Sequence, residues 1–134
     1  QHRIADIKSR YEVKEINVVC GNLREPKAEI TLLCPDGQER FYSSNGTGPV
    51  DAVCKAIDSI IDTEVELTEF SVSGVTEGID SLGEVTIRIE HNGSIYSGRG
   101  SDTDIVVASA KAYVNAINRL ILIGSQDKDI TEVV

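Results

Sequence analysis

The sequence predicts an α+β domain built from two βββα units related by a pseudo-twofold axis. Along the 134 residues, the order strand, strand, turn, strand, glycine-rich segment and amphipathic helix occurs twice. The second predicted strand has the same pattern in both units, AEITLLC at 28–34 and GEVTIRI at 83–89. The dipeptide Lys55-Ala56 recurs as Lys111-Ala112, 56 residues later. A chain of this length is expected to form one domain, with helices covering one face of each sheet.

The first unit is predicted to span residues 11–62. Alternation of apolar and polar residues predicts its strands at 13–19, 28–34 and 39–43, with a turn at 35–37. A helix then runs to about Ile61, with Pro49 in its first turn, where a missing N–H has no partner to lose. Spacing by three and four gives this helix one apolar face, formed by Val50, Val53, Cys54, Ile57, Ile60 and Ile61.

The second unit is predicted to span residues 65–123. Its strands are expected at 65–73, 83–89 and 94–98, with a turn at 91–93. The helix that follows is expected to end near Ile123 and to bury Ile105, Ala108, Ala112, Ala116, Ile117 and Leu120. Residues 1–10 are interpreted as a linker or the end of a preceding helix, and residues 124–134 as a polar tail.

Charge excludes several classes of partner. The chain has 13 basic and 22 acidic residues, a net charge of −9. Such a surface repels nucleic-acid phosphates and anionic membranes, so neither is an expected partner. No run approaches the roughly 18 apolar residues of a membrane span, and no signal peptide is expected. We therefore expect a cytoplasmic protein. The absence of methionine predicts that Gln1 is internal to a longer polypeptide, with removal of a start methionine as the alternative.

Neither catalysis nor metal binding is predicted. Cys20, Cys34 and Cys54 are odd in number and widely spaced, which argues against disulfides and zinc and favours reduced, buried thiols. His2 lies in the presumed linker and His91 in a tight turn, so neither has convergent catalytic partners. The sequence therefore predicts no catalytic residue, no metal ligand and no cofactor.

Two segments that lead into helices are candidate ligand sites. In SNGTGPVD, at 44–51, spacing alone favours a plain loop with a capped helix; the alternative is an anion site, where free N–H groups and the helix dipole attract a carboxylate or phosphate. In GRGSDTD, at 98–104, Asp102 and Asp104 are expected to cap the helix, and could also accept an ammonium group. The loop EGIDSLG, at 77–83, offers Asp80 and Ser81. Leu67, Phe70 and Ile105 are interpreted as core residues, with an apolar pocket as the alternative.

Two longer motifs carry a family resemblance. VTEGIDSLGEVTIRIEHNGSIYSGRGSDTDIVVASAKAYVNAINRL resembles the C-terminal regulatory domain of 2-isopropylmalate synthases, and SSNGTGPVDAVCKAID fits the same family. The likeness covers about Tyr11 to Leu122. Citramalate synthases share the domain.

The resemblance implies a function. In that family a metal-dependent (β/α)8 barrel, N-terminal to this domain, condenses acetyl-CoA with a 2-oxo acid. The C-terminal domain dimerises and binds the feedback inhibitor, which is leucine for isopropylmalate synthases and isoleucine for citramalate synthases. The expected function is thus leucine sensing for an enzyme that uses 2-oxoisovalerate. The alternatives are isoleucine sensing for a citramalate synthase and a purely structural dimerisation module.

The resemblance also implies a set of effector-binding residues. One wall would come from the first unit, and the others from the first strand, the following loop and the helix of the second unit. These positions are Gly46, Thr47, Gly48, Val50, Asp51, Leu67, Phe70, Gly74, Ser81 and Ile105, and the candidate acceptors for the ligand's ammonium group are Asp51, Asp80, Asp102 and Asp104. Phe70 stands where some relatives have tyrosine, and Thr47 where others have a different small polar residue, which leaves the choice of effector open.

Overall fold

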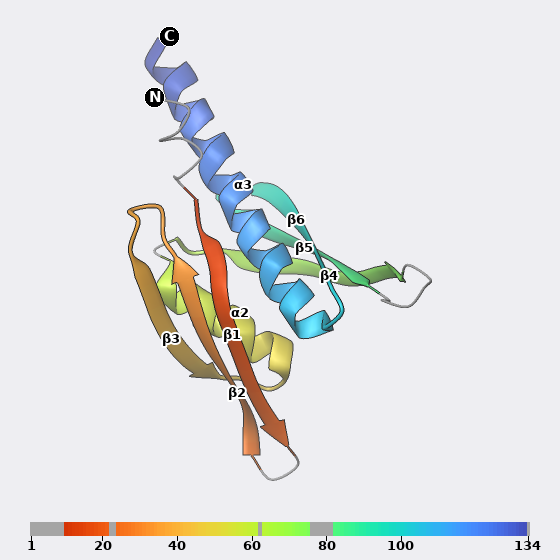
Figure 1. Cartoon of the computed structure of the whole chain (residues 1–134). Coiled ribbons are helices and arrows are strands. Elements are labelled where there is room, and N and C mark those ends of the chain that lie inside the picture. Colours follow the sequence, from red (N-terminus) through yellow and green to blue (C-terminus); the bar gives the residue numbers. More distant parts are fainter. Residues whose placement is uncertain (1–9, 22–23, 62, 76–81, 134) are drawn as a thin grey trace.

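The computed structural model describes residues 10–21, 24–61, 63–75 and 82–133. Two three-stranded antiparallel sheets, ordered β1-β2-β3 and β4-β5-β6, are each followed by a helix (Figure 1). This confirms the predicted α+β fold with two βββα units. The elements are β1 Glu12–Gly21, β2 Arg24–Leu33, β3 Glu39–Asn45, α2 Pro49–Ile60, β4 Glu66–Val75, β5 Gly83–His91, β6 Ser94–Asp102 and α3 Ile105–Val133.

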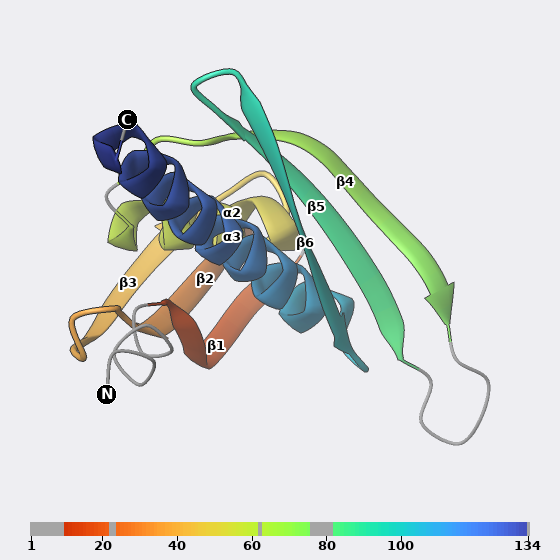
Figure 2. The same ribbon diagram turned by 90° about the horizontal axis from the view of Figure 1, so that it is seen from above.

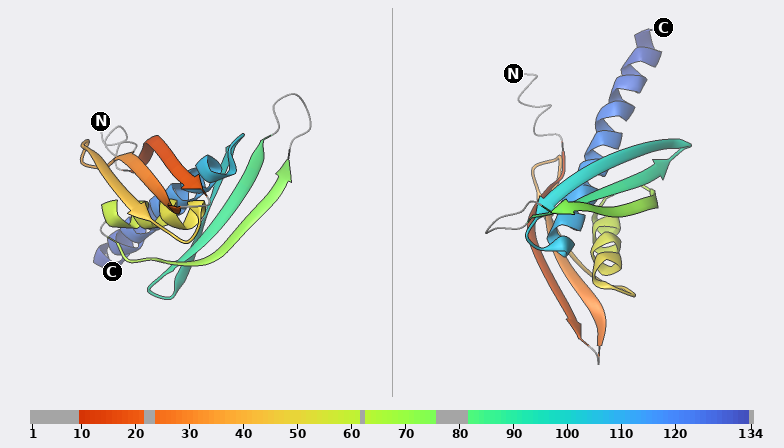
Figure 3. Two further views of the ribbon diagram at one scale, coloured as in Figure 1. Left: turned by 90° about the horizontal axis from the view of Figure 1, so that it is seen from below. Right: turned by 90° about the vertical axis from the view of Figure 1, so that its right-hand side faces the viewer.

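The core lies between the sheets and the helices. Helix α2 packs on β2 and β3, α3 packs on β5 and β6, and the two helices contact each other. Figures 2 and 3 show the two sheets on different sides of the helix pair. The central strands supply alternate buried residues, as a half-covered strand should. These are Ala28, Ile30 and Leu32 in β2, and Val85, Ile87 and Ile89 in β5.

Glycines let β6 approach α3 closely. A Cβ at Gly98 would lie 2.3 Å from the carbonyl oxygen of Ala112 and 2.3 Å from the backbone nitrogen of Ala116. A Cβ at Gly100 would lie 2.3 Å from the carbonyl oxygen of Ala108. The alanines that the sequence predicted as the buried face of the helix therefore pack directly against strand backbone.

Helix α3 is longer than the sequence predicts. Its apolar pattern ends near Ile123, but the helical backbone continues to Val133. The first 19 residues, Ile105–Ile123, are also long and apolar enough to cross a membrane, with a mean hydropathy of 1.3. This corrects the expectation that no run approaches a membrane span. Half of that stretch is buried within the fold, as is usual for a core helix.

The first strand of each unit contains a bulge at the same motif. The register shifts between Val13 and Glu15 in β1, and between Leu67 and Glu69 in β4. The sequences VKEI and LTEF thus each place two apolar residues, three positions apart, on one face of the strand. In β4 these are Leu67 and Phe70, in register with the inward-facing Ile89 and Ile87.

The inner face of β4 is uncovered. In the described part of the chain neither helix approaches β4, whereas both approach β1. The β1 residues Val13, Ile16 and Val18 pack against the core. Leu67, Phe70 and Val72 instead remain 40%, 38% and 50% exposed. We call these three residues the β4 apolar strip.

Candidate functional site

The first helix start, residues 46–51, is held by one carboxylate. Asp51, the third residue of α2, accepts hydrogen bonds from the backbone nitrogen of Thr47 at 2.9 Å and from its hydroxyl at 3.4 Å. Lys55 lies 3.3 Å from the same oxygen. The hydrogen bond from the Thr47 backbone, more than the charge of Lys55, holds the pKa of Asp51 below its ordinary value. Asp51 is therefore ionised, and it shapes the loop.

The two glycines of this loop have different roles. A Cβ at Gly46 would lie 2.5 Å from the Ala52 nitrogen and 2.7 Å from the Asp51 carboxylate, so only glycine fits. Gly48 is the N-cap of α2, with an extended backbone (φ −152°) and open space where a Cβ would point. It provides no side-chain cap, and the first intrahelical bond runs from Ala52 to Gly48. The first-turn N–H groups of α2 are thus left to solvent or to an anion.

The second helix start, residues 102–105, is capped by carboxylates. Asp104 accepts a hydrogen bond from the Val106 nitrogen at 2.8 Å, which confirms the predicted capping role. Asp102 accepts one from the Asp104 nitrogen at 2.9 Å and lies 3.2 Å from Lys111. The Asp104 N–H is the main reason that the pKa of Asp102 is lowered. This helix start carries two carboxylates, Asp102 and Asp104, whereas the first carries one, Asp51.

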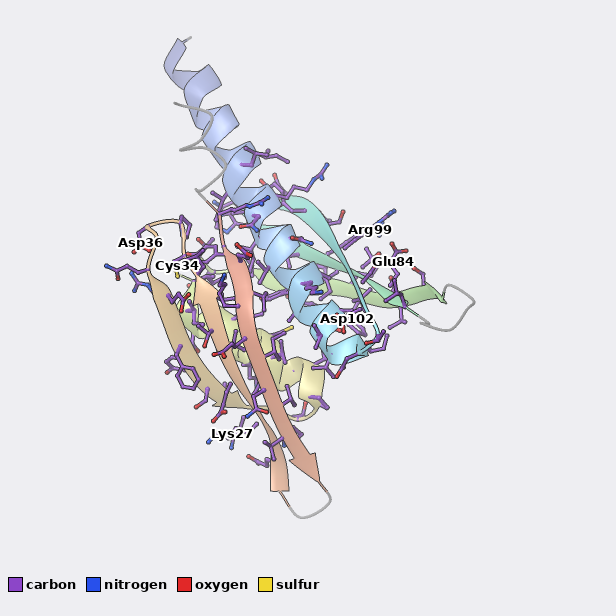
Figure 4. All side chains as sticks on the ribbon, in the orientation of Figure 1. Lys27, Cys34, Asp36, Glu84, Arg99 and Asp102 are labelled. Carbon is purple, nitrogen blue, oxygen red and sulfur yellow. The ribbon has the colours of Figure 1, made fainter. Side chains whose placement is uncertain are left out.

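The two helix starts face the same side of the molecule. In Figures 1 and 2 the first turns of α2 and α3 lie close to each other, and Figure 4 shows Asp102 at the beginning of α3. Tyr113 and Asp58, the ninth residue of α3 and the tenth of α2, are joined by a hydrogen bond. Such an arrangement presents free N–H groups from one helix beside carboxylates from the other.

The apolar candidates occupy different surroundings. Ile105 packs against the core and covers Gly83, where a Cβ would lie 2.3 Å from its Cδ1 atom. Leu67 and Phe70 are exposed, so their interpretation as core residues is wrong. They lie on an edge strand whose helix-facing side no helix reaches, which their apolar character alone could not show.

The structure places some candidate residues together. Gly83 of β5 pairs with Val75 of β4 and with Asp102 of β6, so the end of β4, including Gly74, adjoins the second helix start. Thr47, Val50 and Asp51 group around the first. Asp80 and Ser81 lie outside the described residues. Val72, which the sequence analysis did not single out, shares the face of Phe70, a position that the alternation in FSV could have indicated.

The cysteine, histidine and carboxylate side chains are the remaining candidate metal ligands or nucleophiles in the part of the chain that is described. No group of three His, Cys, Asp or Glu side chains there is placed to hold a metal ion. Cys34 and Cys54 are free and buried, and burial raises the pKa of the Cys54 thiol to about 12. A thiol with so high a pKa is a poor nucleophile. The Nδ1 atom of the His91 ring lies within hydrogen-bond distance, 2.8 Å, of the carbonyl oxygen of Glu64.

Acidification is expected to loosen both helix starts. The folded-state pKa values of Asp51 and Asp102 lie below the ordinary 3.8, so the ionised carboxylates stabilise the fold above that pH. This contribution is lost as the pH falls through the folded-state values. Solvent screens both groups, so the loss should be about 1 kcal/mol for the pair. Urea unfolding at about pH 5 and about pH 3 measures it.

The control for this prediction is the double variant Asp51→Asn, Asp102→Asn, which should depend less steeply on pH. Asp58 acts in the opposite direction, because burial raises the pKa of its carboxyl group. An equally steep pH dependence in the double variant would contradict the prediction.

Comparison with known proteins adds a further finding. Residues 1–121 match the family described as LeuA allosteric (dimerisation) domain. The chain is 56% identical over 113 residues to a 2-isopropylmalate synthase of Prochlorococcus marinus (strain MIT 9211), an alignment that covers 84% of this chain and 21% of that protein. It is 52% identical to the 2-isopropylmalate synthases of Synechococcus sp. (strain WH7803), over 84% of this chain and 21% of that protein, and of Microcystis aeruginosa, over 87% and 22%. The chain thus spans about a fifth of the length of these relatives.

Proposed function

Since this chain belongs to the family of LeuA allosteric (dimerisation) domains, we propose that it binds leucine as the feedback effector of a 2-isopropylmalate synthase. The parent enzyme would condense acetyl-CoA with 2-oxoisovalerate in an N-terminal, metal-dependent barrel and act in the cytoplasm. The present chain would supply regulation and no catalytic group. The relatives' names and the family description support this assignment.

The observation that carries the proposal is the pairing of two unlike helix starts, in a fold that also exposes apolar residues on β4. An amino acid needs donors for its carboxylate, acceptors for its ammonium group and an apolar slot for its side chain. The uncapped first turn of α2 offers donors, and Asp102 and Asp104 offer acceptors. Leu67 and Phe70 of the β4 apolar strip offer an exposed apolar wall.

Leucine should bind and stabilise the chain, and Phe70→Ala should weaken that binding. Removing a ring that is 38% exposed without ligand should raise the Kd roughly tenfold, since about 1–2 kcal/mol of apolar contact is lost. Valine should bind about 1–3 kcal/mol more weakly than leucine. Charged amino acids should fail, because burying an unpaired charge costs more than the slot returns. Calorimetry with a panel of amino acids measures all of these.

Thr68→Ala is a suitable control, because Thr68 is exposed at the β4 bulge and bonds the Arg88 carbonyl oxygen, away from the strip. It should leave the leucine Kd unchanged. Isoleucine binding far more tightly than leucine would assign the domain to a citramalate synthase instead. No response to leucine, isoleucine or valine at millimolar concentration would leave only the structural dimerisation module.

We further propose that the chain is a homodimer and that a second copy contacts the β4 apolar strip at Val72, which leaves Leu67 and Phe70 open to the effector. The strip joins three exposed apolar residues on the inner face of an edge strand, which a single copy leaves open. Sedimentation should therefore give twice the 14.5 kDa mass of one chain. Val72→Lys should shift this mass to 14.5 kDa, since it places a charge within the proposed contact.

Ser73→Lys is the matched control for the dimer. Ser73 is the next residue on the same strand, is exposed, and faces the opposite side with Glu84. This variant should remain dimeric. A wild-type chain that sediments as a monomer at high micromolar concentration would contradict the proposal.

A further inference from the structure

The side chain of Asn118, in the middle of α3, forms two hydrogen bonds to the backbone just before the first strand. The Asn118 Oδ1 atom accepts a hydrogen bond from the Tyr11 backbone nitrogen at 2.8 Å, and the Nδ2 atom donates one to the Tyr11 carbonyl oxygen at 2.9 Å. Tyr11 directly precedes β1 and is 107 residues away in sequence. A side-chain amide is the group that can donate and accept in this paired way. Both hydrogen bonds are partly buried. They hold the main chain of Tyr11, which is less mobile than a side chain.

The same helix also touches the first unit nearer its beginning. Tyr113 is 1% exposed, and its hydroxyl donates to the Asp58 carboxylate of α2. The helix starts at the capping residue Asp104, one of the proposed effector contacts. From Asp104 to Asn118 a helix rises about 21 Å. One rigid element thus connects the helix starts, α2 and the point where the chain enters the domain.

We propose that Asn118 transmits the state of the effector site to the residues that precede β1; this inference rests on the proposed function. A ligand that binds between the helix starts acts on the first turn of α3. A packed helix moves as a body and does not absorb the change locally. Because Asn118 holds both backbone groups of Tyr11, a shift of α3 is passed to the main chain directly before β1.

The space around this contact permits such a movement. A groove of about 400 Å³ lies between the beginning of β1, β6 and α3, and residues that line it include Arg10, Glu12, Val114 and Asn118. The β1 backbone beside Asn118 thus borders open volume on one side. A core without voids would resist the same displacement.

The test compares three variants of the chain. Asn118→Leu removes both bonds, and Asn118→Asp keeps an acceptor for the Tyr11 N–H but loses the donor. Asn115→Leu is the matched control, because Asn115 lies three residues earlier on α3 and donates to the Arg99 carbonyl oxygen of β6, within the second unit. Calorimetry measures leucine binding, and hydrogen exchange with and without leucine follows the Tyr11 amide and the residues before it.

Leucine should change the exchange rate of the Tyr11 amide in the wild type and in Asn115→Leu by roughly fivefold or more, the lower range of coupling between sites. In Asn118→Leu that amide should exchange faster and should not respond to leucine. In Asn118→Asp the response should be reduced. The leucine Kd should be unchanged in Asn115→Leu and should shift in Asn118→Leu by at most about the same factor as the exchange rate, because coupling between two sites is reciprocal. None of these side chains forms part of the proposed ligand site, so leucine binding should persist in all three variants.

The two proposals can fail separately. If the wild type binds no branched-chain amino acid, the proposed function fails and this inference fails with it. The inference alone is wrong if leucine binds but leaves the exchange rate of the Tyr11 amide unchanged in the wild type. It is also wrong if leucine changes that rate in Asn118→Leu and Asn118→Asp as much as in the wild type.

Discussion

Gly48→Asp is expected to abolish leucine binding while the chain stays folded. The new carboxylate would lie at the N-cap of α2, beside the free N–H groups that we assign to the ligand's own carboxylate. The aspartate would accept a hydrogen bond from one of these N–H groups and would repel the carboxylate of leucine, so leucine binding should weaken roughly 100-fold or more. The backbone at Gly48 is extended and nothing lies within 4 Å of a Cβ there, so the substitution fits. Calorimetry and a thermal melt of the same sample measure both effects.

A control two residues away should give the opposite pattern. At Gly46 a Cβ would press against the backbone of Ala52. Gly46→Ala should therefore lower the melting temperature of the ligand-free chain, whereas Gly48→Asp should not. Leucine binding by Gly48→Asp at wild-type strength would remove α2 from the proposed site.

Gly98→Ala is expected to cause the largest loss of stability. The added methyl group would lie 2.3 Å from backbone atoms of both Ala112 and Ala116. Backbone of a packed helix cannot yield as a flexible side chain can, so β6 and α3 would have to separate. We expect a loss of about 3 kcal/mol or more, the upper end of the range for overpacking. Urea unfolding followed by circular dichroism measures the change.

Ser97→Ala provides the comparison on the same strand. Ser97 is exposed and neighbours Gly98, so its replacement should change the free energy of unfolding by less than about 0.5 kcal/mol. If Gly98→Ala were as stable as Ser97→Ala, the close approach of β6 to α3 described above would be wrong.

The architecture could be predicted because its signals are local. Alternation, the turns at 35–37 and 91–93, and the apolar faces of the helices each depend on neighbouring residues. The repeat of these signals then gave two βββα units, which the structure confirms. The capping role of Asp104 was predictable for the same reason, since a carboxylate just before a helix bonds the first-turn N–H groups.

Features that depend on other strands or helices were not predictable. The bulge in β4 puts Leu67 and Phe70 on one face, and it is visible only in the pairing with β5. Leu67 and Phe70 are exposed because α3 packs over β5 and β6 and does not reach β4. The sequence also presents Gly46 and Gly48 as equivalent, yet only the first is required by packing. The extension of α3 to Val133 lies beyond its apolar pattern and left no periodic signal.

The unequal helix starts have a consequence for stereochemistry. The two βββα units place two helices side by side, but one begins at an uncapped glycine and the other at an aspartate. With an apolar wall as a third contact, the proposed site distinguishes three substituents of one carbon atom: carboxylate, ammonium and side chain. Three unlike contacts fix the handedness of what they bind. The proposed site should therefore select L-leucine over D-leucine.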